Sequence, residues 1–231
     1  MLGDWDSGYR PVYWSDNDAI SISGATYTVN SGAGTTTATF TGSGASQTGG
    51  KYKAYYPASI YNGGNPTLPA VQRYVDGRID NLPMYAESSS TNLNFKNLCA
   101  VLNFLLKGTD KVTRVVVTSA TMKLNGSFDP VADGGGYKAS MSGTPTTAEK
   151  KVELDCTGGV SGGNMPLDAT TPIEFCIAVP AADYPQNDLT VEVYGYKGTG
   201  TTEELLMPAF TNSAGNLNAR RSYIYEIGKN T

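Results

Sequence analysis

The stretch that most constrains the fold of this chain runs from residue 93 to residue 128. When its first half is read with a period of two, one side is wholly apolar and the other side is mixed. The apolar side holds Leu98, Ala100, Leu102, Phe104 and Leu106, and the mixed side holds Asn97, Cys99, Val101, Asn103 and Leu105. This alternation is typical of a strand in a sheet that packs on a hydrophobic core.

A helix is the alternative for the same residues, because Leu98, Val101, Leu102 and Leu105 also fit helical spacing. Two features favour the strand. A turn-forming sequence occupies residues 107–110, and a run rich in β-branched residues follows at 112–118. We therefore predict two strands joined as a hairpin, with no more than one helical turn at 95–98.

The rest of the chain also favours strands. Helical patterns are scarce, and the 231 residues include 27 glycines and 15 tyrosines, so we predict an all-β fold. Alternating segments predict further strands at 19–24, 25–29, 35–41, 52–57, 151–154, 171–180, 189–196 and 222–227. The segment 60–83 has little periodicity, but we expect it to be ordered because its apolar residues need burial. These are Leu68, Val71, Tyr74, Ile79 and Leu82, with Met84 just beyond them.

The polar run 87–92 is the natural boundary between two domains. We predict an N-terminal domain at 1–92 and a C-terminal domain at 93–231. The first domain begins where an all-β domain would normally already have its first strand. A domain that lacks one strand exposes unpaired backbone groups and a hydrophobic slot. Such a vacancy can bind a strand of another molecule through its unpaired backbone groups.

The C-terminal segment alternates as a terminal strand that stops four residues from the end. Such a strand pairs either with its own sheet or with the open edge of a neighbouring molecule. The predicted assembly residues are Tyr223, Ile224, Tyr225 and Ile227. We expect Ile224 and Ile227 to matter for subunit joining or for closure of the C-terminal domain.

The composition excludes several classes of function. Without histidine, the chain cannot use Ser-His-Asp or Cys-His catalysis, and most kinds of zinc site are excluded. The net charge of −4, with no basic run beyond Arg220-Arg221, argues against nucleic-acid binding. The aspartates do not have the spacing of a calcium loop, and we interpret them as turn residues. We predict no catalytic residue, no cofactor and no metal site.

The three cysteines are Cys99, Cys156 and Cys176, and they lie far apart in the sequence beside apolar neighbours. We predict that they are small buried hydrophobic residues. Their odd number leaves at least one without an intrachain disulfide partner.

Several motifs, taken in their order and spacing, resemble the fimbrillin family. They are VYWSDNDAI at 12–20, YKAYYP at 52–57, LPAVQRY at 68–74 and LPMYA at 82–86, followed by 93–102, 112–119 and LNG at 124–126. Fimbrillins are subunits of the type V pili of certain Gram-negative anaerobes. The resemblance implies two tandem β-sandwich domains of transthyretin-like topology, and a structural or adhesive role without catalysis.

The resemblance also implies a route of assembly. Export as a lipoprotein is followed by proteolysis after a basic residue, which removes an N-terminal strand. A strand from the C-terminus of the next subunit then fills the groove by donor-strand exchange. The implied location is the fimbrium at the cell surface, with a membrane involved only through the lipid anchor before processing. The implied partners are other pilus subunits, and a host or bacterial surface protein or glycan.

This sequence departs from the family pattern at both ends. Met1 is followed at once by a sequence that looks like the interior of a domain, so we expect the natural protein to have a leader ahead of it. The chain ends directly after the predicted strand 222–227, which indicates a tip or accessory subunit, or a second truncation. A surface carbohydrate-binding module is the rival function, with Trp5, Trp14 and tyrosines such as Tyr9, Tyr13, Tyr61 and Tyr137 as platforms. An enzyme is the third.

Overall fold

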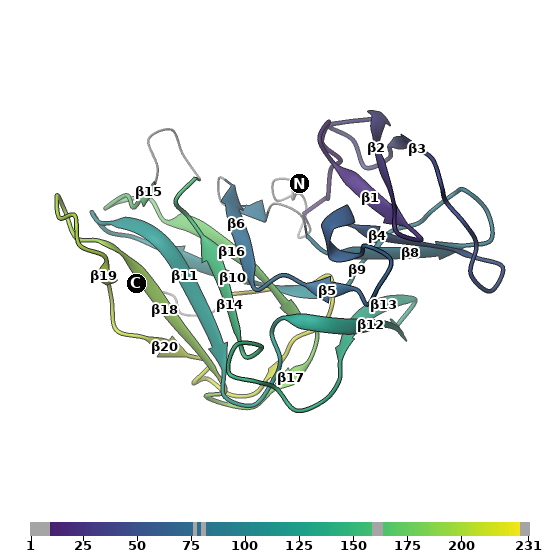
Figure 1. Cartoon of the computed structure of the whole chain (residues 1–231). Coiled ribbons are helices and arrows are strands. Elements are labelled where there is room, and N and C mark those ends of the chain that lie inside the picture. The colour runs from purple at the N-terminus through teal and green to yellow at the C-terminus, as the bar shows by residue number, and fades with distance from the viewer. Residues whose placement is uncertain (1–9, 76–77, 80–81, 159–163, 227–231) are drawn as a thin grey trace.

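The computed structural model describes residues 10–75, 78–79, 82–158 and 164–226 (Figure 1). The regular structure of these residues is β, apart from the short 3-10 turn η1 (Ala58–Ile60). The predicted all-β fold is therefore confirmed. In this part of the chain, no helix has the length and apolar character needed to cross a membrane.

The N-terminal part folds into one sheet, at the upper right of Figure 1. Its strands, in spatial order, are β3 (Thr39–Gly42), β2 (Ala25–Ser31), β1 (Ala19–Ile22), β4 (Tyr52–Tyr56), β8 (Met84–Ser88) and β9 (Lys96–Asn97). The pairs are antiparallel throughout. Side chains alternate between its two faces, so that Tyr55 and Tyr85 point to one side and Tyr56 and Met84 to the other.

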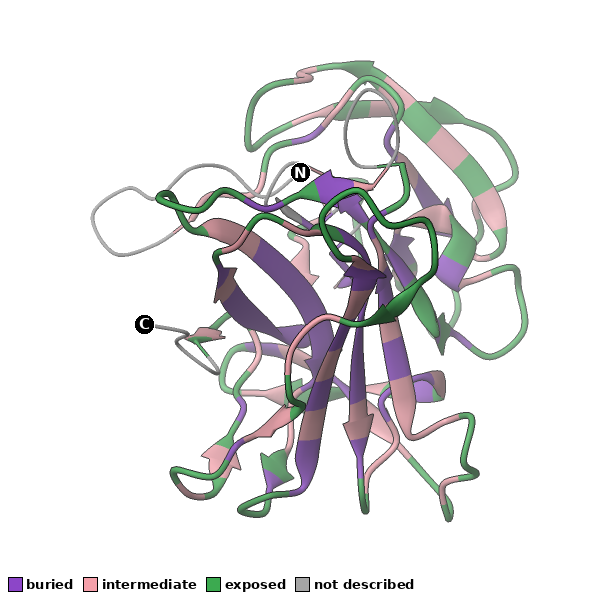
Figure 2. Cartoon of the chain, turned by 90° about the vertical axis from the view of Figure 1, so that its left-hand side faces the viewer, coloured by how far each residue is buried: buried purple, intermediate pink, exposed green. Residues whose placement is uncertain are grey.

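The larger body contains two sheets that face each other. One has the order β19 (Glu204–Leu205), β18 (Leu189–Tyr196), β11 (Lys111–Ser119), β14 (Lys151–Asp155), β6 (Val71–Val75) and β7 (Arg78–Ile79), with β15 (Met165–Pro166) on β11 and β20 (Phe210–Thr211) on β18. The other has the order β16 (Ile173–Pro180), β10 (Cys99–Leu106) and β22 (Ile224–Glu226). Buried residues follow the long strands, and exposed residues gather in the loops at their ends (Figure 2).

Two smaller sheets complete the fold. One joins β13 (Gly136–Met141), β12 (Gly126–Asp133) and β5 (Thr67–Leu68), and the other pairs β17 (Asp183–Tyr184) with β21 (Leu217–Asn218). The first of these lies between the larger body and the N-terminal sheet (Figure 1).

The core is divided into successive layers. The first core fills the space between the two sheets of the larger body, and includes Leu102 and Phe104 of β10 and Val115 of β11. The second core lies on the opposite face of β10 and β16, and reaches Tyr55 and Tyr85 of the N-terminal sheet. A third cluster lies on the far face of that sheet.

The predicted hairpin between 98–106 and 112–118 is wrong, although both segments are strands. β10 pairs with β16 and β22, whereas β11 pairs with β14 and β18. The two strands lie on opposite sides of the first core because their apolar side chains meet there. The turn at 107–110 therefore carries the chain from one sheet to the other.

The face of β10 that we expected to be mixed is also buried. Cys99 and Val101 lie in the second core, and the exposed fraction of Asn103 is 2%. The Asn103 amide donates to one oxygen of Glu174 at 2.8 Å, and Arg10 donates to the other oxygen at 2.8 Å. Polar groups buried on this face are therefore paired, as burial of a charge requires.

Strand pairing crosses residue 92 in several places. β9 pairs with β8, β5 pairs with β12, and β6 pairs with β14. The division into domains at 1–92 and 93–231 therefore stays a prediction. The segment 60–83 is packed as expected at Leu68, Tyr74, Ile79 and Leu82, as is Met84, but Val71 is 56% exposed and its predicted burial is wrong.

All three cysteines are buried, as their apolar neighbours predicted, and none of them forms a disulfide. Burial raises the pKa of the Cys99 and Cys176 thiols to about 12 and raises that of Cys156 further. These thiols are therefore protonated at neutral pH and unsuited to nucleophilic chemistry.

Glu149 stabilises the connection between β13 and β14, and its contribution depends on pH. Its carboxylate accepts hydrogen bonds from the backbone and hydroxyl of Thr146 and from Lys123, at 2.8–2.9 Å. The backbone bond of Thr146, then Lys123, lowers the Glu149 pKa to about 2. Because the folded pKa lies below the unfolded value of about 4.3, the stabilisation is full above that pH and is lost as pH falls toward 2. We expect Glu149→Gln to be less stable than wild type at pH 7, with the difference closing between pH 4.5 and 2, measured by urea unfolding across pH.

Candidate functional site: a groove on the N-terminal sheet

The third hydrophobic cluster lies on a sheet face that is only partly covered. Its buried members are Trp14, Ile20, Ile22, Ala54, Tyr56 and Met84. Further apolar residues pack against them but stay partly exposed, among them Tyr27, Phe40, Leu93 and Phe95. No second sheet of the described residues covers this face; the loop segments around Trp14, 36–38 and 91–95 lie over it instead.

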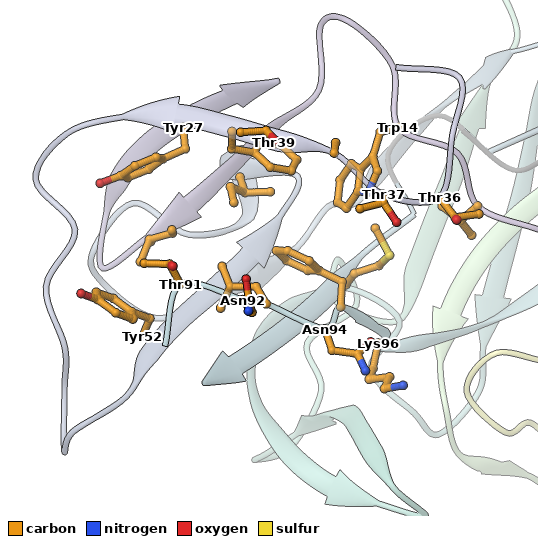
Figure 3. Close-up of a pocket in the computed structure, with 18 of the residues that line it drawn as sticks. Trp14, Tyr27, Thr36, Thr37, Thr39, Tyr52, Thr91, Asn92, Asn94 and Lys96 are labelled. Carbon is orange, nitrogen blue, oxygen red and sulfur yellow. The ribbon is translucent and has the colours of Figure 1, made fainter. Parts of the chain in front are cut away.

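The uncovered part of this face forms a groove of about 1060 Å³, which we call the sheet groove. This volume is slightly above the range of about 300–1000 Å³ typical of ligand pockets. The described residues that line it are Val12, Trp14, Ile20, Ile22, Tyr27, 36–40, Gly44, Ala45, Tyr52, Met84, 91–97 and Ser222. In Figure 3, Tyr27 and Tyr52 lie at one end, and Thr36 and Lys96 lie at the other.

The Trp14 side chain anchors the wall of the groove. Its ring packs edge-on against Phe40, Tyr56 and Phe95, with centroid distances of 4.9, 5.1 and 5.4 Å. The turn that follows Trp14 is held by the Asp18 carboxylate. This carboxylate accepts hydrogen bonds from the Ser15 backbone N–H and from the Tyr56 hydroxyl, both at 2.7 Å. Trp14 is only 8% exposed, so its ring is packed and is not a flat platform for a sugar.

Two segments beside the groove carry backbone that belongs to no sheet. They are 36–38, just before β3, and 92–95, just before β9. Within the described part of the chain, the backbone groups of Leu93, Asn94 and Phe95 make no backbone hydrogen bond. The side chains of Leu93 and Phe95 pack on the third cluster, whereas Asn92 and Asn94 are exposed. This alternation is that of a strand without a partner.

Charge in the groove is confined to one place. Among the described residues that line it, Lys96 alone has a charged side chain. Its ammonium group has no ion-pair partner in that part of the chain, whereas Lys51 and Lys123 pair with Glu87 and Glu149 at 2.6 and 2.9 Å. The groove can therefore bind an extended apolar molecule, and the described residues that line it include no pair of groups suited to acid–base chemistry.

The predicted assembly strand pairs with its own sheet. β22 runs parallel to β10, with Ile224 opposite Val101 and Tyr225 opposite Leu102. Ile224 packs against the second core and Tyr225 against the first, whereas Tyr223 is 61% exposed. Ile227 lies outside the described residues. Ser222, two residues before this strand, lines the sheet groove, so the predicted assembly strand and the groove are neighbours.

A charged side chain at residue 224 is expected to weaken the closure of this sheet. Ile224→Asp places a carboxylate against the second core, which should lower the free energy of unfolding by about 1–3 kcal/mol. Urea unfolding measures this, and Tyr223→Ser, on the exposed neighbour, should change the value by no more than about 0.5 kcal/mol. If Ile224→Asp left both stability and assembly as in wild type, the assignment of Ile224 would be wrong.

Other candidate chemistry takes part in packing or turns. In the described residues, no three Cys, Asp or Glu side chains gather closely enough to hold a metal ion. The Asp133 and Gly134 carbonyls accept hydrogen bonds from Arg221 at 2.7–2.9 Å, which fixes the glycine-rich turn. Tyr61 stacks on Tyr55 and Tyr137 packs edge-on against Tyr85, with centroid distances of 4.4 and 4.7 Å. Trp5 and Tyr9 lie outside the described residues.

No protein-family model and no curated protein matches the chain. Among solved structures, it is similar to one described as "a putative cell adhesion protein from Bacteroides ovatus ATCC 8483", at 15% identity and a TM-score of 0.47, over 94% of this chain and 84% of that chain. At this identity and TM-score, the likeness does not establish a shared fold.

Proposed function

We propose that this chain is a non-enzymatic subunit of a cell-surface fibre, of the fimbrillin-like kind, and that a β-strand of another subunit occupies its sheet groove. The observation that carries the proposal is the partly covered apolar face of the N-terminal sheet, flanked by backbone that pairs with no strand of the described residues. A strand laid beside 92–95 would supply both the hydrogen bonds and the apolar cover that this face lacks.

The expected energetics are favourable. An added strand directs every second side chain toward the floor formed by residues such as Ile20, Ile22 and Phe40. Each fully buried aliphatic or aromatic side chain contributes about 1.5–3 kcal/mol. A few such side chains, together with the backbone ladder, exceed the cost of ordering a short segment and give a long-lived joint.

In this proposal, β22 and the strand bound in the sheet groove have different roles. β22 is an edge strand of the sheet β16-β10-β22 and belongs to this chain. The strand in the groove is supplied by a partner molecule. Tyr223, Ile224 and Tyr225 then contribute to assembly through this edge, which is where a further strand would add, and Ile227 stays a predicted assembly residue. Delivery to the cell surface through a lipid anchor, with processing there, belongs to the same proposal.

A site-specific cross-link tests the proposal. A photo-reactive phenylalanine at Asn94, on the groove rim, is introduced into the natural full-length product in its own cells. We expect light to join it to a terminal segment of another subunit of the same fibre, identified by mass spectrometry. The same group at the exposed Lys107, outside the groove, should give no such product. If Asn94 joins only to its own chain, the proposal is overturned.

A further inference from the structure

We propose that the strand bound in the sheet groove carries an acidic side chain opposite Lys96, which fixes its direction and register. This inference rests on the proposed function and adds the chemistry of the partner.

The alternation along 92–96 places Lys96 with Asn92 and Asn94, the residues that form the rim of the groove. Leu93 and Phe95 pack on the third cluster, so Asn92, Asn94 and Lys96 occupy the other set of alternate positions. A strand paired with this segment places its own rim-facing side chains directly opposite these residues. The rim therefore presents amide groups along its length and a single cation at one end (Figure 3).

The charge of Lys96 lacks compensation in the described structure. The side chain is half-buried and lies on the face of the sheet that carries Tyr85, because these two residues are paired, and a strand bound along 92–96 would place a side chain directly beside it and remove it further from water. Burying an unpaired ammonium group is unfavourable, whereas burying it against a carboxylate is much less so. A strand with Asp or Glu at this position is therefore favoured over one with a neutral residue, and Lys or Arg is disfavoured.

The groove also distinguishes a peptide from a lipid. An anionic lipid would use Lys96 at one end, but elsewhere it needs only apolar walls. Here Thr37, Thr39, Thr91 and Asn92 border the groove along its length, and the backbone at 93–95 has no backbone partner among the described residues. Hydrogen-bonding groups distributed in this way match the repeating polar groups of a strand.

Selection from a random ten-residue peptide library displayed on phage tests the inference on the full chain. We expect wild type to enrich peptides with alternating apolar residues and with Asp or Glu at one polar position, by about tenfold over Lys or Arg. Lys96→Glu should reverse this preference to Lys or Arg at the same position. Lys107→Glu, the same charge reversal at an exposed site outside the groove, should leave the preference as in wild type.

The outcomes separate this inference from the proposed function. Enrichment of alternating apolar peptides with no charge preference would overturn the role of Lys96 and leave strand addition standing. No enrichment over a variant with a filled groove, Ala38→Trp, would overturn strand addition itself. Binding of dodecanoate that Lys96→Glu abolishes, in the absence of peptide enrichment, would assign the groove to a lipid and overturn both.

Discussion

Phe104→Ala is expected to lower the free energy of unfolding by about 3–5 kcal/mol, which is much of the stability of a typical domain. Phe104 has no exposed surface and lies in the first core, and its ring packs edge-on against Phe210 at a centroid distance of 5.9 Å. Both sheets of the larger body contact this core, so the cavity cannot close without moving one of them. Urea unfolding followed by circular dichroism measures the loss.

The matched control is a truncation at the surface. Leu205→Ala removes an apolar side chain that is 37% exposed on the edge strand β19, and should cost less than about 1 kcal/mol. Equal losses for the two variants would show that the first core does not hold the two sheets together as described.

The sequence indicates the strands of this fold better than their pairing. Alternation identified 98–106 because a strand has a period of two whatever its neighbours are. The hairpin failed because adjacency along the chain does not say whether a turn joins neighbours in one sheet or crosses a core. Both faces of β10 are buried, one of them around Asn103 and Glu174, and this explains the mixed pattern that suggested a solvent-facing side.

The sheet groove could be predicted only in part. We expected a hydrophobic vacancy left by a missing strand in the N-terminal region; one face of the sheet there is only partly covered, and its origin in a missing strand stays a prediction. The residues that line it were not predicted, because 36–38 and 92–95 come close only once the sheet has formed. One signal was present: Leu93 and Phe95 alternate with Asn92 and Asn94 directly after the polar run that suggested a linker. An alternating segment with no strand to pair with indicates an open edge.

Filling the sheet groove is expected to abolish subunit joining without unfolding the chain. Ala38→Trp adds a large side chain at a partly exposed position that lines the groove, where there is space for it. If it displaces about two apolar side chains of the incoming strand, the loss is about 3 kcal/mol, and binding should weaken by at least about 100-fold. The measurement is the fraction of the natural full-length product found in fibres, with circular dichroism as the check on folding.

The control for this variant adds the same bulk elsewhere. Val131 is 42% exposed on β12 and does not line the groove, so Val131→Trp should leave incorporation into fibres close to the wild-type level. A folded Ala38→Trp chain that still joined fibres as well as wild type would show that no partner strand enters the groove. The apolar face would then be a feature of this fold alone, because a side chain of that size and a buried strand cannot occupy the same space.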